Sequence, residues 1–397
     1  MTDATIDDSS AEPVRGFAAF ESEGRGAIAS RAAQLMCMAA FASDADVSDL
    51  QDDAALLEVP MVPVAPSPEP FSDELALDRL TESALASRVP GLWTADSAEA
   101  PPVEAKQIAW EDIERMQSVL PLSVLLNVCL RSEHPLERVA AAAALHRLSE
   151  SVLATATGAL LEATDSEDPL VRAIANATLG IEQATGEGSG TAAAGAGDGE
   201  PVSVTVHGTW GMVGTDPWYR PGALLHDHIR DEVSANLFDA PGYFIWTGGF
   251  SEADRDAGAR DLSVWRTRQG FTEFDSVYAH SHGGNVALTA AADGERIRLL
   301  VLMHTPAIPR ADEEWAVIRR NVGRVVVMRT RMDLVVLADR LRTGSRQRFD
   351  ARLLPHFHVE LHWAKGDGWF SHDFFVTKQK WDQYRIAEIV RSQHALA

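Results

Sequence analysis

Hydrophobic and polar positions change their pattern near residue 200 of this 397-residue chain. Beyond that point, amphipathic helical stretches separate short apolar runs, which lie near 202–206, 242–247, 275–279, 297–303, 324–330 and 357–363. Short apolar strands that alternate with helices are typical of a mostly parallel sheet. The pattern predicts an α/β fold for residues 201–397, with helices on both faces of the sheet.

Helical periodicity with many alanines dominates residues 105–184. The helix expected from Pro135 repeats at Pro169, because both segments read proline, leucine, any residue, arginine, and continue into an alanine-rich stretch. Proline suits the first turn of a helix, and small residues let stacked helices approach closely. The segment resembles a HEAT-type repeat and is expected to bind a protein partner. An ordinary alanine-rich bundle is the alternative, because a solenoid of two copies is short.

Residues 1–104 are rich in Ala, Asp, Ser and Pro, a composition that predicts a mostly flexible acidic region. Helices are expected over 26–41 and 72–88, either as partner-docking elements or, in the favoured interpretation, packed on the next domain. Residues 185–200 are rich in Gly and Ala and predict a flexible linker. A fragment that starts near Glu200 is therefore expected to fold alone.

A serine stands where the apolar run 275–279 ends and a helical pattern begins. A serine on a sharp strand-to-helix turn needs small residues two positions before and after it, because strand, turn and helix crowd together there. Ala279 and Gly283 meet that need around Ser281. The pentapeptide resembles the nucleophile elbow of the α/β-hydrolase superfamily in its Ala-x-Ser-x-Gly form. The resemblance implies an α/β-hydrolase fold with Ser281 as the nucleophile.

The first apolar run, 202–206, ends in His207 and Gly208, which resemble the His-Gly oxyanion turn of the superfamily's lipases. Acyl transfer places negative charge on the carbonyl oxygen, and two N–H groups aimed at that oxygen stabilise it. By resemblance, the oxyanion donors are the backbone amides of His282 and Thr209. The neighbouring Trp210 is the other candidate for the second donor.

In the superfamily, the acid and then the histidine of the triad follow the nucleophile, each just past a strand. Asp333 follows the apolar run 324–330, and His372 follows the run 357–363. The resemblance implies that His372 is the general base for Ser281 and that Asp333 orients its ring. Asp333 on its own is equally explained as a helix N-cap, because aspartate is favoured at that position.

Other histidines compete for these roles. On the last expected strand, His356, His358 and His362 alternate on one face, which favours structural or surface roles. Two further histidines stand two apart on an expected helix, and side chains at that spacing do not share a face: His226 and His228.

A metal site at the elbow is disfavoured as well. His280 and His282 resemble the His-x-His opening of a metallo-β-lactamase-type site, but Gly284 and Asn285 stand where the next two ligands belong. No metal and no cofactor is therefore expected.

Composition limits the partners and the location. Net charge is −15 over residues 1–104, −8 over 105–200 and zero over 201–397, so no basic stripe suits a nucleic acid. The chain has two cysteines, Cys37 and Cys129, which excludes a disulfide framework. It shows neither a signal peptide at its start nor an apolar run of about 20 residues that could span a membrane. A cytoplasmic location is expected.

Aromatic and apolar residues follow the strand ends, where ligands bind in such sheets. They are candidates for an acyl pocket or for plain packing: Trp210, Met212, Trp218, Tyr219 and 304–306. Together these features predict a serine hydrolase that cleaves small-molecule or lipid carboxylic esters through an acyl-enzyme. The alternatives are a catalytically degenerate hydrolase domain in a scaffold protein, and an amide or thioester hydrolase with the same triad.

Overall fold

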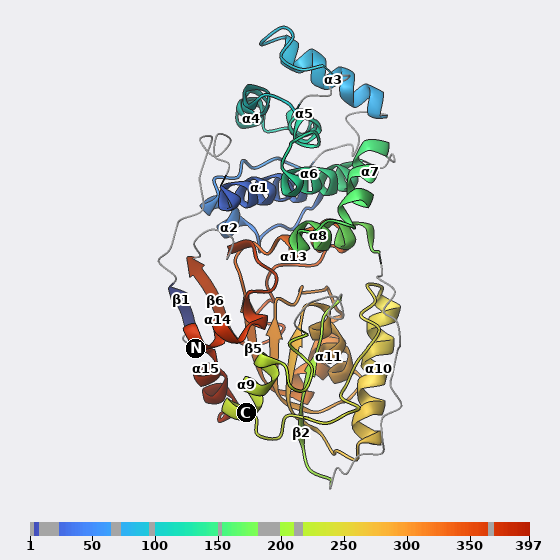
Figure 1. Ribbon diagram of the computed structural model, residues 1–397, viewed down its shortest axis with the longest axis vertical. Helices are drawn as coiled ribbons and strands as arrows, with labels where there is room; N and C mark the ends of the chain where they lie inside the picture. The colour runs from blue at the N-terminus through green and yellow to red at the C-terminus, as the bar shows by residue number, and fades with distance from the viewer. Residues whose placement is uncertain are drawn as a thin grey trace.

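The structure is a computed structural model that describes residues 4–7, 24–64, 73–94, 100–149, 153–181, 199–209, 217–363 and 369–397. Its centre is a sheet of six parallel strands in the order β1-β6-β5-β4-β3-β2 (Figure 1). Consecutive strands from β2 to β6 are neighbours, so each crossover advances by one strand. The strands are β1 (Ala4–Asp7), β2 (Val202–Val206), β3 (Phe274–His280), β4 (Ile297–Met303), β5 (Val322–Arg329) and β6 (Phe357–Trp363).

Helices cover both faces of this sheet. Along β3, Val277 and Ala279 belong to one hydrophobic core, whereas Tyr278 between them belongs to the other. Apolar residues on both faces are the expected pattern of a strand buried on both sides. The first face carries α10 (Glu252–Arg268), α11 (His282–Ala292) and α12 (Asp312–Asn321); the second carries α9 (Leu224–Glu232), α13 (Leu334–Thr343), α14 (Lys378–Gln383) and α15 (Ile386–His394). The predicted α/β class with a parallel sheet is confirmed.

Two features of the sheet differ from the sequence-based expectation. Residues 242–247 form no strand, although Phe244 and Trp246 are buried there. Burial of the two aromatic rings explains the apolar pattern, and the Trp246 Nε1 donates to the backbone oxygen of His207 at 2.7 Å rather than to a side chain. The second difference is β1, which comes from the acidic N-terminus, pairs with β6 and forms one edge of the sheet.

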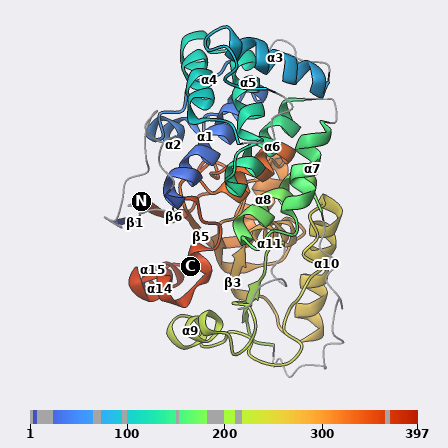
Figure 2. The same ribbon diagram turned by 45° about the horizontal axis from the view of Figure 1, so that its top comes forward.

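Eight helices precede the second strand in the described residues, and the two expected near the N-terminus are among them. They are α1 (Arg25–Ser43), α2 (Gln51–Leu56), α3 (Glu74–Ala86), α4 (Val103–Met116), α5 (Val119–Cys129), α6 (Pro135–Leu148), α7 (Ala154–Ala163) and α8 (Pro169–Leu179). The described parts of residues 1–104 are thus mostly helical rather than flexible. Alanine explains the difference, because its small side chain lets α1 pack closely on α6 (Figure 2). The proline-rich spacer falls partly, and the glycine-rich linker almost wholly, outside the described residues.

The sequence repeat is also a structural repeat. Helices α6 and α8 both begin at the repeated proline, Pro135 and Pro169. Arg138 donates through Nη1 to the backbone oxygen of Ser132 at 2.7 Å, and Arg172 makes the equivalent bond to Ser166. The two arginines therefore tie each helix to the turn before it, and they are half-buried rather than fully solvated.

The helical part and the sheet part share one hydrophobic core. Helix α13, which follows β5, packs against α1, α6 and α8 on its outer side (Figure 1). The independent folding of residues 201–397 stays a prediction. Removal of the N-terminal helices would expose the outer face of α13. A continuous core of this kind is typical of a single cooperative unit.

Buried ion pairs reinforce this contact. Asp53 is fully buried, and its carboxylate lies 3.4 Å from a guanidinium nitrogen of Arg329, 3.1 Å from one of Arg331 and 2.8 Å from one of Arg348. Arg340 on α13 bonds to Asp44 and Asp49 at 2.8 Å. Part of the N-terminal acidity is thus matched by arginines of the sheet part.

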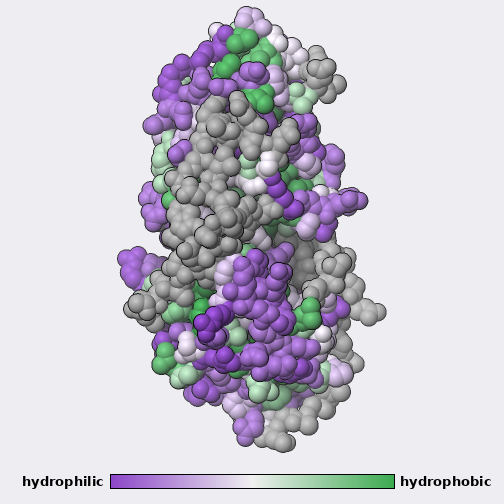
Figure 3. Space-filling model, turned by 60° about the vertical axis from the view of Figure 1, so that its left-hand side comes forward, coloured by the Kyte–Doolittle hydropathy of each residue, from purple (hydrophilic) through white to green (hydrophobic). Residues whose placement is uncertain are grey.

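Exposed apolar side chains are scattered over the surface. Figure 3 shows one face on which the coloured residues are mostly hydrophilic and the hydrophobic ones form small separate groups. In the described ranges, no helix combines the length and the hydropathy that a membrane span requires.

Candidate active site

Five neighbouring strands direct side chains to the same edge of the sheet. Thr209, Ser281, His304, Asp333 and His372 follow β2, β3, β4, β5 and β6, respectively. The carboxyl ends of parallel strands meet at one edge, which is where ligands bind in open α/β sheets. The residues named from the sequence for catalysis are therefore brought to the same edge, together with His304.

Ser281 occupies an unusual backbone conformation. Its φ is 52° and its ψ is −136°, a combination that L-residues rarely adopt and that costs about 1–3 kcal/mol. The N–H of Ser281 donates to the oxygen of Met303 at 2.8 Å, which ties the turn to the end of β4. Strain of this kind is expected where a serine is held on a sharp turn between a strand and a helix.

Small residues around Ser281 are required by close contacts. A Cβ atom at Gly283 would lie 2.3 Å from the backbone oxygen of His207, and one at Gly208 would lie 2.6 Å from the Cβ of Ser281. Ala279 is fully buried at the end of β3. The crowding that the elbow interpretation requires is present on both sides of the serine.

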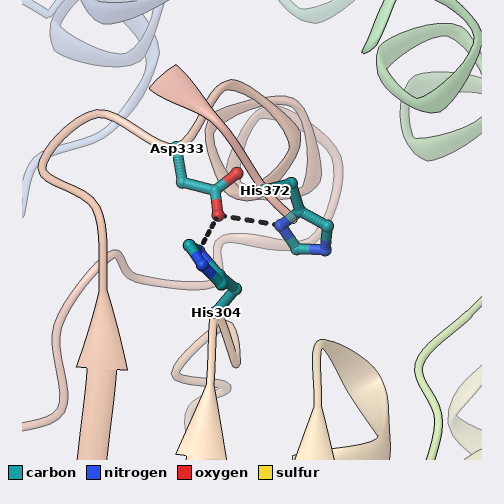
Figure 4. Close-up of side chains that lie close together, drawn as sticks. All are labelled: His304, Asp333 and His372. Atoms are coloured by element: carbon teal, nitrogen blue, oxygen red, sulfur yellow. Dashed lines mark hydrogen bonds and ion pairs between the residues drawn. The ribbon is translucent and has the colours of Figure 1, made fainter. Parts of the chain in front are cut away.

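Asp333 uses both carboxylate oxygens. Its Oδ2 accepts hydrogen bonds from the Nδ1 of His372 at 2.8 Å and from the Nδ1 of His304 at 3.0 Å (Figure 4). Its Oδ1 accepts from the backbone N–H groups of Val335 and Val336 at 3.0 and 3.1 Å, which caps α13. The two interpretations of Asp333, helix cap and partner of His372, are therefore compatible.

The charges of this pair favour a base that is poised for proton transfer. Burial alone would raise the pKa of Asp333, but the charge of His372 and the hydrogen bonds from both histidines hold it well below its usual value. Burial lowers the pKa of His372, but the Asp333 carboxylate outweighs that effect and raises it above the usual value. Asp333 is consequently ionised, and His372 is a stronger base than a free histidine.

His304 contacts the Asp333 carboxylate, whereas the sequence analysis named it only as a pocket-lining candidate. Its Nε2 accepts a hydrogen bond from the N–H of Phe375 at 3.3 Å, so its proton lies on Nδ1 and is donated to Asp333. Burial lowers the pKa of His304, which keeps the ring neutral. One signal in the sequence could have found it: His304 directly follows a strand, and this strand lies between the strands that precede Ser281 and Asp333.

The same three residues must be tested as a metal site. His304, Asp333 and His372 offer ligand atoms within 4.8 Å of one another. A metal ligand needs a lone pair, however, and the bond from Phe375 leaves His304 with a proton on the nitrogen that faces Asp333. Both histidines donate N–H groups to the Asp333 carboxylate. In this tautomer, the three residues do not offer the lone pairs that a metal ion needs.

His280 and His282 flank the serine, and their rings have different partners. The Nε2–H of His280 donates to the backbone oxygen of His372 at 3.0 Å, which fixes the loop that carries the base. The Nε2 of His282 lies 3.7 Å from Oδ1 of Asp339 on α13. Burial lowers the pKa of both rings, so they are neutral at pH 7.

The other histidines named from the sequence lie elsewhere. His226 contacts the backbone oxygen of Phe238, whereas His228 packs edge-on against Trp381, so the pair does not share a face of α9. Ligand atoms of His226, Asp227 and Asp239 also lie close together, but the Arg230 guanidinium pairs with both carboxylates. His358 accepts from Arg329 at 3.2 Å, and the His362 side chain lies outside the described residues.

Of the two expected oxyanion donors, His282 directly follows the serine, and Thr209 follows Gly208, whose backbone lies against Ser281. His282 is the first residue of α11, and the first N–H groups of a helix have no intrahelical partner. Thr209 is buried after β2, and its Oγ1 has no hydrogen-bond partner in the described part of the chain. Trp210 and Met212, also named from the sequence, lie outside the described residues.

Ser281 and His372 both line a small cavity of about 10 Å³. Its volume is close to that of a single water molecule. Ser281 is 3% exposed, and the Nε2 of His372, on the side of the ring away from Asp333, has no hydrogen-bond partner among the described residues. The cavity is lined by Phe250, Ser281, His282, Pro306, Val335, Val336, Asp339 and His372. Trp218 and Tyr219 do not line it; they pack near His280 and His207.

Comparisons add no relative to this picture. We find no protein-family model, no curated protein and no solved structure that the chain matches.

Proposed function

We propose that this chain is a serine hydrolase of the α/β-hydrolase type that cleaves carboxylic esters through an acyl-enzyme. One observation carries the proposal. Ser281, held in a strained turn at the end of β3, lines the same small cavity as His372, whose Nδ1 donates to the buried Asp333 at 2.8 Å. A nucleophile on a sharp strand-to-helix turn, a base and an orienting acid in this chain order are the features by which such a triad is recognised.

In this mechanism, the Nε2 of His372 removes the proton from the Oγ of Ser281 as that oxygen attacks the ester carbonyl. The carbonyl oxygen becomes negative and is stabilised by the backbone amides of His282 and Thr209. His372 then gives the proton to the departing alcohol, which leaves an acyl group on Ser281. Water repeats the sequence: His372 takes its proton, the hydroxide attacks the acyl carbon, and the carboxylic acid is released as Ser281 regains its proton.

Asp333 and His304 hold the base rather than react. The Asp333 carboxylate keeps the His372 proton on Nδ1, so Nε2 is free to accept the serine proton. His304 binds the same oxygen from the other side and restricts the rotation of the carboxylate. The pair of backbone N–H groups on Oδ1 completes its fixation.

A second candidate is a catalytically degenerate hydrolase domain. The observation that favours it is the small size of the cavity: a space of about 10 Å³ suits a water molecule and is too small for an ester, so the side chains that line it must move for a substrate to enter. Amide and thioester bonds are further substrates that the same triad could cleave.

Ester turnover tests the proposal. The full-length chain should hydrolyse short-chain nitrophenyl esters, and Ser281→Ala should lose about 10⁴- to 10⁶-fold in turnover. Ser276→Ala is the matched control, because Ser276 is a buried serine of the same strand β3 and lies outside the cavity. Activity should survive exhaustive chelation. Equal loss in both variants, or loss on chelation with recovery in zinc, would reject the serine mechanism.

A further inference from the structure

One wall of the Ser281 cavity carries a buried carboxylate to which no described residue donates a hydrogen bond of normal length. Asp339 lies on α13, is 2% exposed and lines the cavity together with Ser281 and His372. Neither of its carboxylate oxygens has a hydrogen-bond partner among the described residues. The triad does not use Asp339, because the acid that binds His372 is Asp333.

The neighbours of Asp339 do not neutralise it at close range. The Nε2 of His282 is 3.7 Å away, beyond hydrogen-bonding distance. The Nδ1 of this ring faces the Nδ2 of Asn285 at 3.4 Å, so its proton lies on Nε2, and burial lowers its pKa and leaves it uncharged. Burial would raise the pKa of Asp339, but the influence of His282 and Ser345 outweighs it, and the carboxylate is ionised at neutral pH.

Two arginines act on Asp339 from a greater distance, and Phe250 engages both. Arg255 donates through Nη1 to the backbone oxygen of Phe250 at 2.7 Å. The guanidinium of Arg342 lies 4.0 Å from the centroid of the Phe250 ring. They moderate the charge of Asp339 but leave its hydrogen-bonding capacity open.

A buried carboxylate that lacks hydrogen-bond donors lowers the stability of the folded state. Removing a charged group from water without a hydrogen-bonded partner is unfavourable, and native proteins rarely retain it outside functional sites. The rest of this wall is apolar, with Val335 and Val336 on the same helix. A ligand that brings N–H donors and positive charge into the cavity would satisfy both oxygens at once.

We propose that Asp339 binds an ammonium group of the substrate, so that the favoured substrates are esters that carry an amino group near the scissile carbonyl. This inference rests on the proposed function, because the substrate is an ester only if Ser281 is a hydrolase nucleophile. Asp339 is then the specificity-determining residue, and the apolar side chains Phe250, Pro306, Val335 and Val336 surround the connecting carbon chain.

Competition with a neutral active-site label tests this inference. The rate at which a neutral fluorophosphonate labels the full-length chain is measured with n-butylammonium or with 1-butanol, which has nearly the same shape, at matched ionic strength. A charge-assisted bond should make butylammonium about tenfold or more the stronger competitor. Asp339→Asn, which keeps the shape and removes the charge, should bring the two competitors within about twofold of each other.

A second measurement does not depend on catalysis. Because a ligand that binds only the native state stabilises it, butylammonium should raise the Tm of the wild type more than that of Asp339→Asn. Asp293→Asn is the matched control: it removes an exposed carboxylate at the C-terminal end of α11 and should behave as the wild type does.

The outcomes separate the two proposals. Equal competition by butylammonium and 1-butanol in the wild type overturns the ammonium site, as does an unchanged ratio in Asp339→Asn. If no label reaches Ser281, the serine hydrolase proposal fails, and the Tm comparison alone then decides on the ammonium site.

Discussion

His304 and His372 donate to the same atom, the Oδ2 of Asp333, over 3.0 and 2.8 Å. Their roles differ because their second nitrogens differ. The Nε2 of His304 is occupied by the N–H of Phe375, whereas the Nε2 of His372 has no partner among the described residues and lies on the cavity side. One histidine is therefore fixed as a positioning residue, and the other is left able to take a proton.

Replacing His304 should slow catalysis without abolishing it. His304 has a φ of 52°, and Asn tolerates positive φ, so His304→Asn removes the ring with little backbone cost. Loss of one hydrogen bond to a charged group is worth about 1.5–3 kcal/mol, so kcat/KM should fall about ten- to a hundredfold. The measurement is steady-state hydrolysis of a nitrophenyl ester. His356→Asn serves as the control, and a loss as large as that of Ser281→Ala would contradict a positioning role.

The pH dependence should reflect the raised pKa of His372. Only the neutral ring accepts the serine proton, so activity falls as the pH decreases through this pKa. Since the Asp333 carboxylate raises the pKa of His372, the midpoint of the acidic limb of kcat/KM should lie above about 6.5, the value of a free histidine. A midpoint below pH 6 would show that the Asp333 charge does not govern the base.

Two glycine substitutions should have opposite effects on stability. Gly283→Ala places a Cβ atom 2.3 Å from the backbone oxygen of His207, and backbone atoms yield little, so at least about 1–3 kcal/mol of stability should be lost. Gly158→Ala adds its Cβ in open space on α7, where replacing a helical glycine gains about 0.5–1 kcal/mol. Urea unfolding of both variants measures the difference. An unchanged free energy of unfolding in Gly283→Ala would contradict the steric requirement for glycine at this turn.

The ion pairs between the two halves should matter for folding. Asp53 is fully buried, and its carboxylate pairs with Arg329, Arg331 and Arg348, so Asp53→Ala removes the one acid that these three arginines share and should cost about 3–5 kcal/mol. Asp52→Ala is the control: the Asp52 side chain is 85% exposed, and its loss should change stability by about 0.5 kcal/mol or less. Equal unfolding midpoints for the two variants would contradict this account.

For the same reason, a fragment that begins near Glu200 should aggregate rather than fold. Its outer α13 face would lose the packing of α1, α6 and α8. The expectation from the sequence was the opposite. Light scattering and circular dichroism of the purified fragment decide between them, and a monomeric, cooperatively folded fragment would restore the two-domain interpretation.

Local signals were sufficient for most of the sheet. The strands β4 and β6 begin and end at the residues that the sequence predicted. For β4 the reason is that buried parallel strands are nearly continuous apolar runs. Ser281, Asp333 and His372 could be named because each follows a strand in a fixed order. The hydrogen bond between Asp333 and His372 agrees with that prediction.

Long-range packing could not be inferred in the same way. Helix α1 has no polar face that would have marked its position, and it is buried because α6 and α13 enclose it, which depends on residues more than a hundred positions away. The pairing of β1 with β6 joins opposite ends of the chain. Phe244 and Trp246 are buried outside the sheet, and their alternating apolar positions cannot be told from those of a strand in the sequence.

The central claim is that Ser281 is a nucleophile activated by His372. Its most direct test is to react the full-length chain with a fluorophosphonate and to map the adduct by peptide mass spectrometry, in the wild type, in Ser281→Ala and in His372→Ala. The account predicts one adduct, on Ser281, that is absent from Ser281→Ala and forms orders of magnitude more slowly in His372→Ala. An unlabelled wild type, or an adduct that persists in Ser281→Ala, would contradict it.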